Sequence, residues 1–235
     1  MLYPFSLIVS YITARRRRKY LKGASETHKS EVPVIVVGNL TIGGTGKTPL
    51  VKYIASELLS LGYKPGLVSR GYGGKFKETL LVSAQTPVKQ TGDEAQILAT
   101  LNLPFYIDKS RVRAVKAITD NHDCDIIISD DGLQHYKMNR DIEIVVIDGK
   151  RRFGNNLTFP AGPLRESKAR LNSVDFIVNN SGPTDEGEYL MNVSPSRFVH
   201  LKSGKSYPIE DWPMHKQVHA VAGLGNPGRF FDLLA

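Results

Sequence analysis

Apolar residues occur along the chain in short continuous runs that alternate with longer stretches of helical spacing. The run at residues 34–37 predicts a buried strand, because consecutive apolar residues suit a strand that is covered on both faces. Residues 49–61 predict a helix, because their apolar side chains recur near helical spacing. The same two patterns predict strands at 67–69, 105–107, 126–128 and 142–147, a looped region at 70–90, and helices at 93–101 and 111–118.

The segment between the first predicted strand and helix carries the most informative residues, Thr41, Ile42, Gly43, Gly44, Thr45, Gly46, Lys47 and Thr48. A strand, a glycine loop and a helix form a phosphate-binding loop, in which backbone N–H groups and the helix N-terminus surround phosphate oxygens. We expect Lys47 to reach the outer phosphates and Thr48 to offer its hydroxyl to Mg²⁺. Thr41 replaces the first glycine of the general pattern, so the loop is a variant. The alternative is a glycine-rich turn that binds nothing.

Strands separated by helices predict an α/β fold of the P-loop NTPase type, a mostly parallel sheet with helices on both faces. Ligands in such sheets bind beyond the carboxyl ends of the strands. Glycine, asparagine and proline accumulate between Asp148 and Pro163, which predicts a boundary there. We expect an N-terminal segment at 1–22, a nucleotide-binding domain at 23–150 and a smaller α/β domain at 151–235. The possible strands of the smaller domain are 176–178, 189–193, 198–201 and 218–221.

An apolar strand that ends in carboxylates is a second signal for phosphate chemistry. The predicted strand at 126–128 leads into Asp130 and Asp131. Phosphate-loop proteins hold Mg²⁺ with acidic residues in this position, although acidic residues also end strands as turn formers. Two strand–helix units fit between the loop and these residues. We therefore expect a metal role for at least one of the two aspartates.

Other polar residues follow predicted strands or turns. Arg70 follows a strand on the same rim as the loop and can pair with a phosphate in bidentate fashion. Glu94 and its neighbour Asp93 open a helix, where carboxylates are also favoured as caps. Arg165 and Glu166 end a proline-rich turn, which alternatively begins a helix. His135 can either carry protons or be a hydrogen-bonded structural residue, and the sequence leaves both roles open.

Composition limits the class of protein. The chain has 235 residues, of which 41% are hydrophobic and 23% charged, so it is globular and not disordered. The lone Cys124 excludes an internal disulfide framework and suits a reducing compartment. The net charge of +8 indicates anionic partners, but where the charge lies matters more than its sum.

Five of the basic residues form one run at 15–19, directly after an apolar aromatic segment at 2–14. The segment is shorter than the ~20 apolar residues that span a bilayer, and its charge follows the apolar part, unlike a secretory signal. A short apolar segment beside a polybasic run is typical of a membrane-surface anchor. An ordinary packed helix and a nucleic-acid-binding segment are the alternatives. Nucleic acid is disfavoured because no stacking-aromatic motif of a known module appears.

The motifs together resemble one family, tetraacyldisaccharide 4'-kinase, the lipid A 4'-kinase of Gram-negative bacteria. The resemblance covers almost the whole chain, including the N-terminal apolar–basic segment, and several motifs in order are more specific than any one alone. The motifs that carry it, in chain order, are NLTIGGTGKTP at 39–49, SRGYG at 69–73, GDE at 92–94, DDGLQH at 130–135, PLRE at 163–166, and GLGNP at 223–227 followed by RFF at 229–231.

The resemblance implies a kinase that moves the γ-phosphoryl group of ATP to the 4'-hydroxyl of a tetraacylated glucosamine disaccharide 1-phosphate. It places the enzyme peripherally on the cytoplasmic face of the inner membrane, with the lipid A disaccharide precursor and the anionic membrane surface as partners, no nucleic acid, and a monomeric state. By motif, Asp93 is expected to accept the proton of the attacking hydroxyl. Lys47 and the loop hold phosphate, Thr48, Asp130 and Glu94 serve Mg²⁺, and Asp131, Arg165 and Glu166 organise metal and substrate.

The chain departs from the family pattern at its end. In the family, a Phe-Pro-Asp-His-His segment follows the Asn-Pro-x-Arg-Phe-Phe region, and its histidine partners the aspartate that matches Asp93. The sequence ends at Ala235, before such a segment. We therefore expect a C-terminally truncated member with an incomplete second domain, retained nucleotide binding, and weak or absent turnover. The alternatives are a non-catalytic nucleotide-binding remnant and a nucleotide switch or ATPase, against which Ile42 argues because it occupies the signature lysine position of that class.

Overall fold

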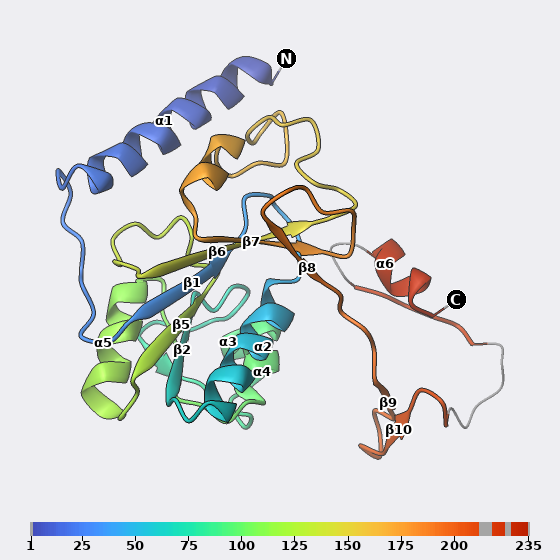
Figure 1. The fold of residues 1–235 in the computed structure, drawn as a ribbon. Coiled ribbons are helices and arrows are strands. Elements are labelled where there is room, and N and C mark those ends of the chain that lie inside the picture. The colour runs from blue at the N-terminus through green and yellow to red at the C-terminus, as the bar shows by residue number, and fades with distance from the viewer. Residues whose placement is uncertain (1, 212–217, 224–226, 235) are drawn as a thin grey trace. The chain divides into compact units, whose positions relative to one another are not determined.

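The computed structural model describes residues 2–211, 218–223 and 227–234 (Figure 1). The chain divides into two compact units, Met1–Met191 and Asn192–Ala235. The larger unit is built around one sheet, and each unit is described by itself below.

The sheet of the larger unit has eight strands in the order β3-β4-β2-β5-β1-β6-β7-β8. Every neighbouring pair is parallel except β3 with β4, which is antiparallel at one edge. The strands are β1 Val34–Gly38, β2 Pro65–Ser69, β3 Leu80–Leu81, β4 Phe105–Ile107, β5 Ile126–Asp130, β6 Ile142–Asp148, β7 Phe176–Asn180 and β8 Glu188–Met191. This confirms the predicted mostly parallel sheet.

Alternate residues of the central strand β1 point to opposite faces of the sheet, and each face carries its own core. Val34 and Val36 pack in one apolar cluster, whereas Ile35 and Val37 pack in the other. All residues of β1 are buried, which is why the strand reads as a continuous apolar run and not as an alternating one.

Helices cover both faces of the sheet, as predicted. Helix α5 (Arg111–Asn121) contributes Ala114, Val115 and Ile118 to the first cluster. The helices α2 (Lys47–Ser60) and α4 (Asp93–Ala99) contribute to the second. Two short elements complete this unit, α3 (Val88–Thr91) before α4 and the 3-10 helix η1 (Lys168–Ser173) before β7.

The N-terminal helix α1 (Tyr3–Leu21) lies beside the segment that links β6 to β7 (Figure 1). Near its start, the Ser6 carbonyl accepts a hydrogen bond of 2.7 Å from the Thr158 hydroxyl. Near its end, Arg17 donates to the Ser173 hydroxyl at 2.8 Å. The helix is therefore attached at both ends to the link that leads from β6 into β7.

The smaller unit contains the antiparallel pair β9 (Arg197–Val199) and β10 (Ser206–Pro208), and the short helix α6 (Pro227–Asp232). The strand predicted at 198–201 corresponds to β9. The strand predicted at 218–221 was wrong, because these residues have no regular secondary structure. Their side chains at Val218 and Val221 are 54% and 90% exposed, so no neighbouring strand covers them.

Three boundaries differ from the sequence-based ones. Helix α2 begins at Lys47 and not at residue 49, because the glycine loop runs directly into the first helical turn. The predicted loop at 70–90 contains β3 and the start of α3. The compact units separate after Met191, whereas the sequence placed a boundary at 151, because β7 and β8 continue the main sheet.

Candidate active site

The glycine loop leaves the carboxyl end of β1 and enters α2, with two of its glycines in the left-handed region. Gly43 has φ 103° and Gly46 has φ 94°, conformations that residues with a Cβ rarely adopt. Gly46 is also the residue that directly precedes the first turn of α2. The loop therefore places consecutive peptide groups beside a helix N-terminus, the arrangement that binds phosphate.

The loop is held from one side by the proline-rich turn that follows β6. The N–H of Ile42 donates to the Pro163 carbonyl at 2.8 Å, and the N–H of Arg165 donates to the Leu40 carbonyl at 2.6 Å. Thr41, which stands where the general pattern has glycine, forms a bridge with Leu164. This pairing brings Arg165 and Glu166 to the glycine loop, although more than a hundred residues of sequence separate them.

Lys47, Asp131 and Arg165 form an ionic cluster at the start of α2. Lys47 Nζ lies 3.5 Å from Asp131 Oδ1, and Arg165 Nη1 lies 2.8 Å from the same oxygen. Burial opposes ionisation of Asp131, but the two cations hold its pKa below the usual value. The φ of Asp131 is 49°, an uncommon conformation for a residue with a side chain. The cluster supplies two cations and one carboxylate at the expected position of the outer phosphates.

Asp130, the last residue of β5, is 2% exposed, and its Oδ1 has no hydrogen-bond partner among the described residues. Burial raises the pKa of Asp130 to about 7, against the opposing effect of Lys47. A buried carboxylate oxygen without a donor is costly unless it is protonated or binds a cation. Asp130 is therefore well suited to a site in which a divalent cation completes its environment.

Arg111, in the first turn of α5, lies directly behind the two aspartates. It is 3% exposed and donates to the backbone carbonyls of Asp130, at 3.4 Å, and Asp131, at 2.9 Å. Burial lowers its pKa to about 10, so it remains cationic at neutral pH. Arg111 was not predicted from the sequence, because a basic residue at the start of an amphipathic helix has no local signature of burial.

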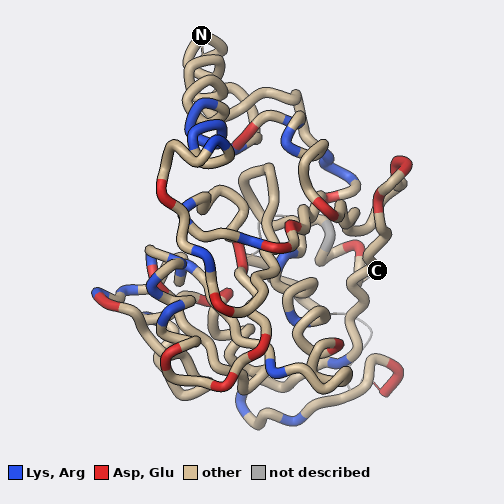
Figure 2. The backbone as a smooth tube through the Cα atoms, turned by 60° about the vertical axis from the view of Figure 1, so that its left-hand side comes forward, with Lys and Arg blue, Asp and Glu red and all other residues tan. Residues whose placement is uncertain are grey.

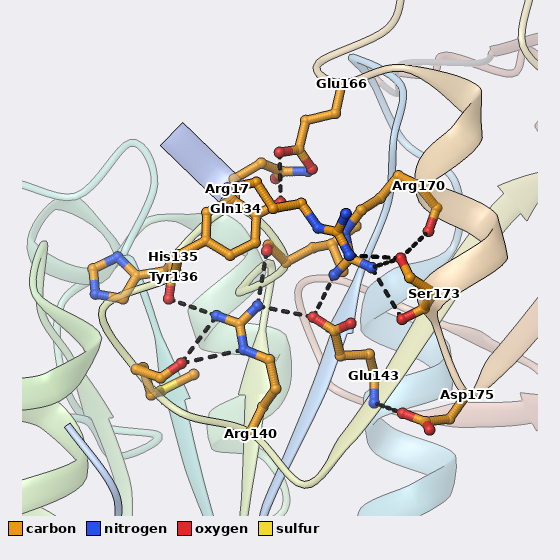
Figure 3. A network of polar contacts seen from close by, with 12 residues as sticks. Arg17, Gln134, His135, Tyr136, Arg140, Glu143, Glu166, Arg170, Ser173 and Asp175 are labelled. Atoms are coloured by element: carbon orange, nitrogen blue, oxygen red, sulfur yellow. Dashed lines mark hydrogen bonds and ion pairs between the residues drawn. The ribbon is translucent and has the colours of Figure 1, made fainter. Parts of the chain in front are cut away.

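Glu166 is 5% exposed and is held at both carboxylate oxygens (Figure 3). The Tyr136 hydroxyl donates to Oε1 at 2.6 Å, and Gln134 Nε2 lies 3.4 Å from Oε2. Gln134 Nε2 also donates to the carbonyl of Asn39, at the start of the glycine loop, at 3.2 Å. Burial and the nearby Glu166 charge raise the pKa of Tyr136, so its hydroxyl keeps the proton that it donates.

Tyr136 connects this part of the site with the end of α1. Its ring stacks on Tyr20 of α1, with centroids 6.0 Å apart, and the Arg140 guanidinium lies 5.3 Å from the ring centroid. Arg140 and Arg170 both pair with the Glu143 carboxylate of β6 (Figure 3). A cavity of about 360 Å³ lies here, and its lining includes Arg17 and Tyr20 of α1 as well as Tyr136, Arg140, Glu143 and Arg170. The last turn of α1 is thus linked to Glu166 through Tyr20, which stacks on Tyr136, and Tyr136, which donates to Glu166.

His135 lies between the aspartates and this network. Burial, with the Arg111 charge next in size, lowers its pKa to about 4, so the imidazole is neutral at pH 7. Its Nε2 has no hydrogen-bond partner among the described residues.

Asp93 and Glu94 are the first residues of α4, and both are exposed. The charge of Glu94 contributes to the raised pKa of Asp130, which indicates that the two carboxyl groups are near each other. Within the described ranges, no hydrogen bond or ion pair joins Asp93 to the cluster of Lys47 and Asp131. The Arg70 charge acts on Arg111, so Arg70 also belongs to this rim of the sheet.

Thr48 follows Lys47 in the first turn of α2 and is half-buried. Among the described residues, no group of three or more His, Cys, Asp or Glu side chains is arranged to hold a metal ion. This is compatible with Mg²⁺, which commonly takes one or two carboxylates together with phosphate oxygens and water. Asp130, with its unpartnered oxygen, and Thr48 fit such a shell.

Comparison with known proteins shows the family to which the chain belongs. A family model described as tetraacyldisaccharide-1-P 4'-kinase matches residues 1–235. The chain belongs to this family. The tetraacyldisaccharide 4'-kinase of Shewanella denitrificans is 45% identical and that of Vibrio campbellii 44% identical, both over 236 aligned positions that cover 100% of this chain. The chain spans 71% and 69% of those two relatives.

A solved structure matches the fold. The crystal structure of LpxK from Aquifex aeolicus in complex with ATP superposes with a TM-score of 0.83 at 31% identity, covering 99% of this chain and 76% of that one. The P-loop kinase fold and the family expected from the motifs are therefore both confirmed.

Proposed function

We propose that this chain is an ATP-dependent kinase of lipid A biosynthesis that phosphorylates the 4'-hydroxyl of a tetraacyldisaccharide 1-phosphate. The family membership and the relatives named as tetraacyldisaccharide 4'-kinases support the reaction. The observation that carries the proposal in this chain is the ionic cluster at the glycine loop, where Lys47 lies 3.5 Å from Asp131. This cluster stands beside a buried carboxylate, Asp130, whose free oxygen suits a cation.

In the reaction, the acceptor oxygen forms a bond to the γ-phosphorus of ATP while the bond from that phosphorus to the β,γ-bridging oxygen breaks. The loop amides and Lys47 bind the phosphates, and Arg165 adds a second cation near Asp131. Mg²⁺, when bound, neutralises phosphate charge between the leaving and transferred groups. Thr48 and Asp130 would hold it, and the charge of Glu94 acts on Asp130.

We assign to Asp93 the role of accepting the proton of the attacking hydroxyl. Its position at the exposed start of α4 leaves the carboxylate open to an acceptor that approaches from solvent or from a membrane. Glu166 has a different role in this proposal: its two oxygens are occupied by Tyr136 and Gln134, so it shapes the site and orients its neighbours.

We further propose that α1 holds the enzyme on an anionic membrane surface. No helix in the described part of the chain is long and apolar enough to span a bilayer. The first half of α1 and the residue before it nevertheless expose a group of large apolar side chains, each more than half exposed: Leu2, Tyr3, Phe5, Leu7, Ile8, Tyr11 and Ile12. The basic run follows on the second half of the helix (Figure 2). Apolar area and adjacent cations together favour anionic lipid surfaces.

The kinase proposal is tested by phosphoryl transfer from labelled ATP, with and without a tetraacyldisaccharide 1-phosphate acceptor in mixed micelles. We expect labelled product that depends on the acceptor and that is lost in Lys47→Ala and strongly reduced in Asp93→Ala. In Asp93→Ala, nucleotide affinity should be nearly unchanged, because that residue does not contact the loop. Hydrolysis of ATP at the same rate without acceptor would contradict the proposal and favour a nucleotide switch.

The membrane proposal is tested by flotation with vesicles of neutral lipid alone or with anionic lipid added. The full chain should float with the anionic vesicles, and less of it at high salt, because the attraction is electrostatic and screened. A variant with Phe5, Ile8 and Ile12 changed to Ser, which keeps every basic residue, should float less. Equal recovery of both proteins in the soluble fraction would reject the anchor.

A further inference from the structure

Three polar side chains from three separate segments hold consecutive carbonyl groups of the glycine loop. Asn39 Nδ2 donates to the Gly43 carbonyl at 3.3 Å. Arg151 Nη2 donates to the Gly44 carbonyl at 2.5 Å, and Asn180 Nδ2 donates to the Thr45 carbonyl at 2.8 Å. Asn39 follows β1, Arg151 follows β6 and Asn180 ends β7, so the donors come from the carboxyl ends of three adjacent strands.

A carbonyl that is held in this way decides where the next N–H group points. The peptide group is planar and trans, so the C=O of one residue and the N–H of the next point in opposite directions. The N–H groups of Gly44, Thr45 and Gly46 therefore point away from the three side chains. In the part of the chain that the structure describes, none of these three N–H groups donates a hydrogen bond.

The three donors are themselves fixed. Asn39 and Asn180 are 0% and 1% exposed. The Arg151 guanidinium is bound by Asp148, with Nε 3.0 Å from Oδ2, and the Arg151 backbone N–H donates to Asp148 Oδ1 at 2.9 Å. Asn180 packs so closely on the loop that a Cβ at Gly46 would lie 2.1 Å from its Nδ2. The two buried asparagines and the Asp148-bound Arg151, whose side chain is 40% exposed, thus hold a loop whose glycines alone would leave it flexible.

We propose that Asn39, Arg151 and Asn180 are positioning residues that aim three loop amides at the phosphate groups of the nucleotide before it binds. The inference rests on the proposed function, because it assumes that the loop binds a nucleoside triphosphate. Donors that are already oriented bind an anion without a further loss of loop entropy, which is the general advantage of preorganisation. The oriented amides strengthen the binding of the phosphate groups and not that of the base or the sugar.

The chain offers a matched control for the strongest test. Asn179 is the residue before Asn180, is equally buried, and donates to the Pro183 carbonyl at 2.7 Å and to Glu188 Oε2 at 2.9 Å. It does not contact the glycine loop, because neighbouring residues of a strand point to opposite faces. Asn180→Ala and Asn179→Ala therefore remove the same side chain from the same strand, and they differ in whether the loop loses a donor.

The experiment measures binding of Mg²⁺ with the β,γ-imido analogue of ATP by calorimetry, for the full chain and both variants, well below their unfolding temperatures. Tripolyphosphate serves as a probe without base or sugar. We expect Asn180→Ala to weaken the binding of both ligands by about ten-fold, because one loop N–H no longer makes a charge-assisted hydrogen bond to a phosphate oxygen. Asn179→Ala should leave the affinity for both ligands within about two-fold of the parent. Arg151→Lys should weaken both ligands as well, because a lysine keeps the charge but cannot hold Gly44 and Asp148 together.

Each other result overturns part of the argument. If the parent chain binds neither ligand, the proposed function fails and the inference fails with it. If the parent binds and Asn180→Ala binds equally well, the positioning role alone is wrong. Equal losses in Asn179→Ala and Asn180→Ala would show general loosening of β7, and full affinity in Arg151→Lys would show that Arg151 acts by charge and not by holding the carbonyl.

Discussion

The substitution Tyr136→Phe removes one buried hydroxyl from the network that links α1 to Glu166. This hydroxyl donates to Glu166 and also interacts with Arg170. The hydroxyl of Tyr136 donates to Glu166 Oε1 at 2.6 Å, and the two residues are 8% and 5% exposed. Phenylalanine keeps the ring, so the stacking on Tyr20 and the Arg140 guanidinium above the ring both remain. No cavity larger than one oxygen atom is created.

The expected cost follows from the character of this bond. A hydrogen bond to a charged group contributes about 1.5–3 kcal/mol, and its loss leaves the buried Glu166 with Gln134 at 3.4 Å as its remaining side-chain donor. For a chain of this size, each kcal/mol lowers Tm by about 2–4 °C. We therefore expect Tyr136→Phe to lower the free energy of unfolding by about 2 kcal/mol and Tm by roughly 4–8 °C.

The assay is urea unfolding followed by circular dichroism, with Tyr20→Phe as the matched control. Tyr20 carries the other ring of the stacked pair, and its hydroxyl makes no hydrogen bond with a described residue, so its removal should change stability by less than about 0.5 kcal/mol. If Tyr136→Phe unfolds at the same urea concentration as Tyr20→Phe, Glu166 does not depend on this donor. Tyr136 would then not connect α1 with Glu166.

Four further predictions test the loop and the buried charges. Because the pKa of Asp130 is raised to about 7, roughly one tenth of its carboxyl groups are ionised at pH 6 and nine tenths at pH 8. Mg²⁺-dependent binding of the ATP analogue should therefore strengthen up to about ten-fold from pH 6 to pH 8. Calorimetry at both pH values tests this, and in Asp130→Asn that part of the pH dependence should be lost. Because of the same raised pKa, the folded state keeps the Asp130 proton between about pH 4 and pH 7, where the unfolded chain loses it. This carboxyl group therefore lowers the stability of the fold as pH rises through that range. Asp130→Asn should raise Tm more at pH 8 than at pH 5. Gly46→Ala should lower Tm, because alanine at φ 94° adds about 1–2 kcal/mol of backbone strain and its Cβ overlaps with Asn180. Gly44→Ala is the control: its Cβ meets open space, so in thermal unfolding this variant should have the Tm of the parent. Arg170→Met should cost about 3 kcal/mol in urea unfolding, the low end for breaking a buried pair, since Glu143 keeps Arg140 at 2.9 Å; a loss below about 1 kcal/mol would mean that Arg140 alone satisfies Glu143.

Local signals in the sequence were sufficient for most of the fold. The strands around β1 are continuous apolar runs because both faces of the sheet are covered, and the glycine loop lies between a strand and a helix, as its pattern requires. The failed strand at 218–221 shows the limit of this reasoning. A few apolar residues become a strand when another strand pairs with them, and the sequence does not say whether one does.

The site divides in the same way. Lys47, Thr48, Asp130 and Asp131 were predicted because their neighbours in sequence already define a strand end or a loop. Arg111 has no such neighbours. Its burial behind the aspartates depends on how α5 packs on the sheet, which no local pattern records.

The sequence by itself determined where a phosphate-binding loop is predicted, because the glycines, the lysine and the threonine are consecutive and their chemistry is local. The tertiary structure decided how that loop is held. Arg151 and Asn180 reach its carbonyls from 107 and 135 residues further along the chain. Parallel strands that are distant in sequence end at one edge of the sheet, and this common edge brings those side chains to the loop.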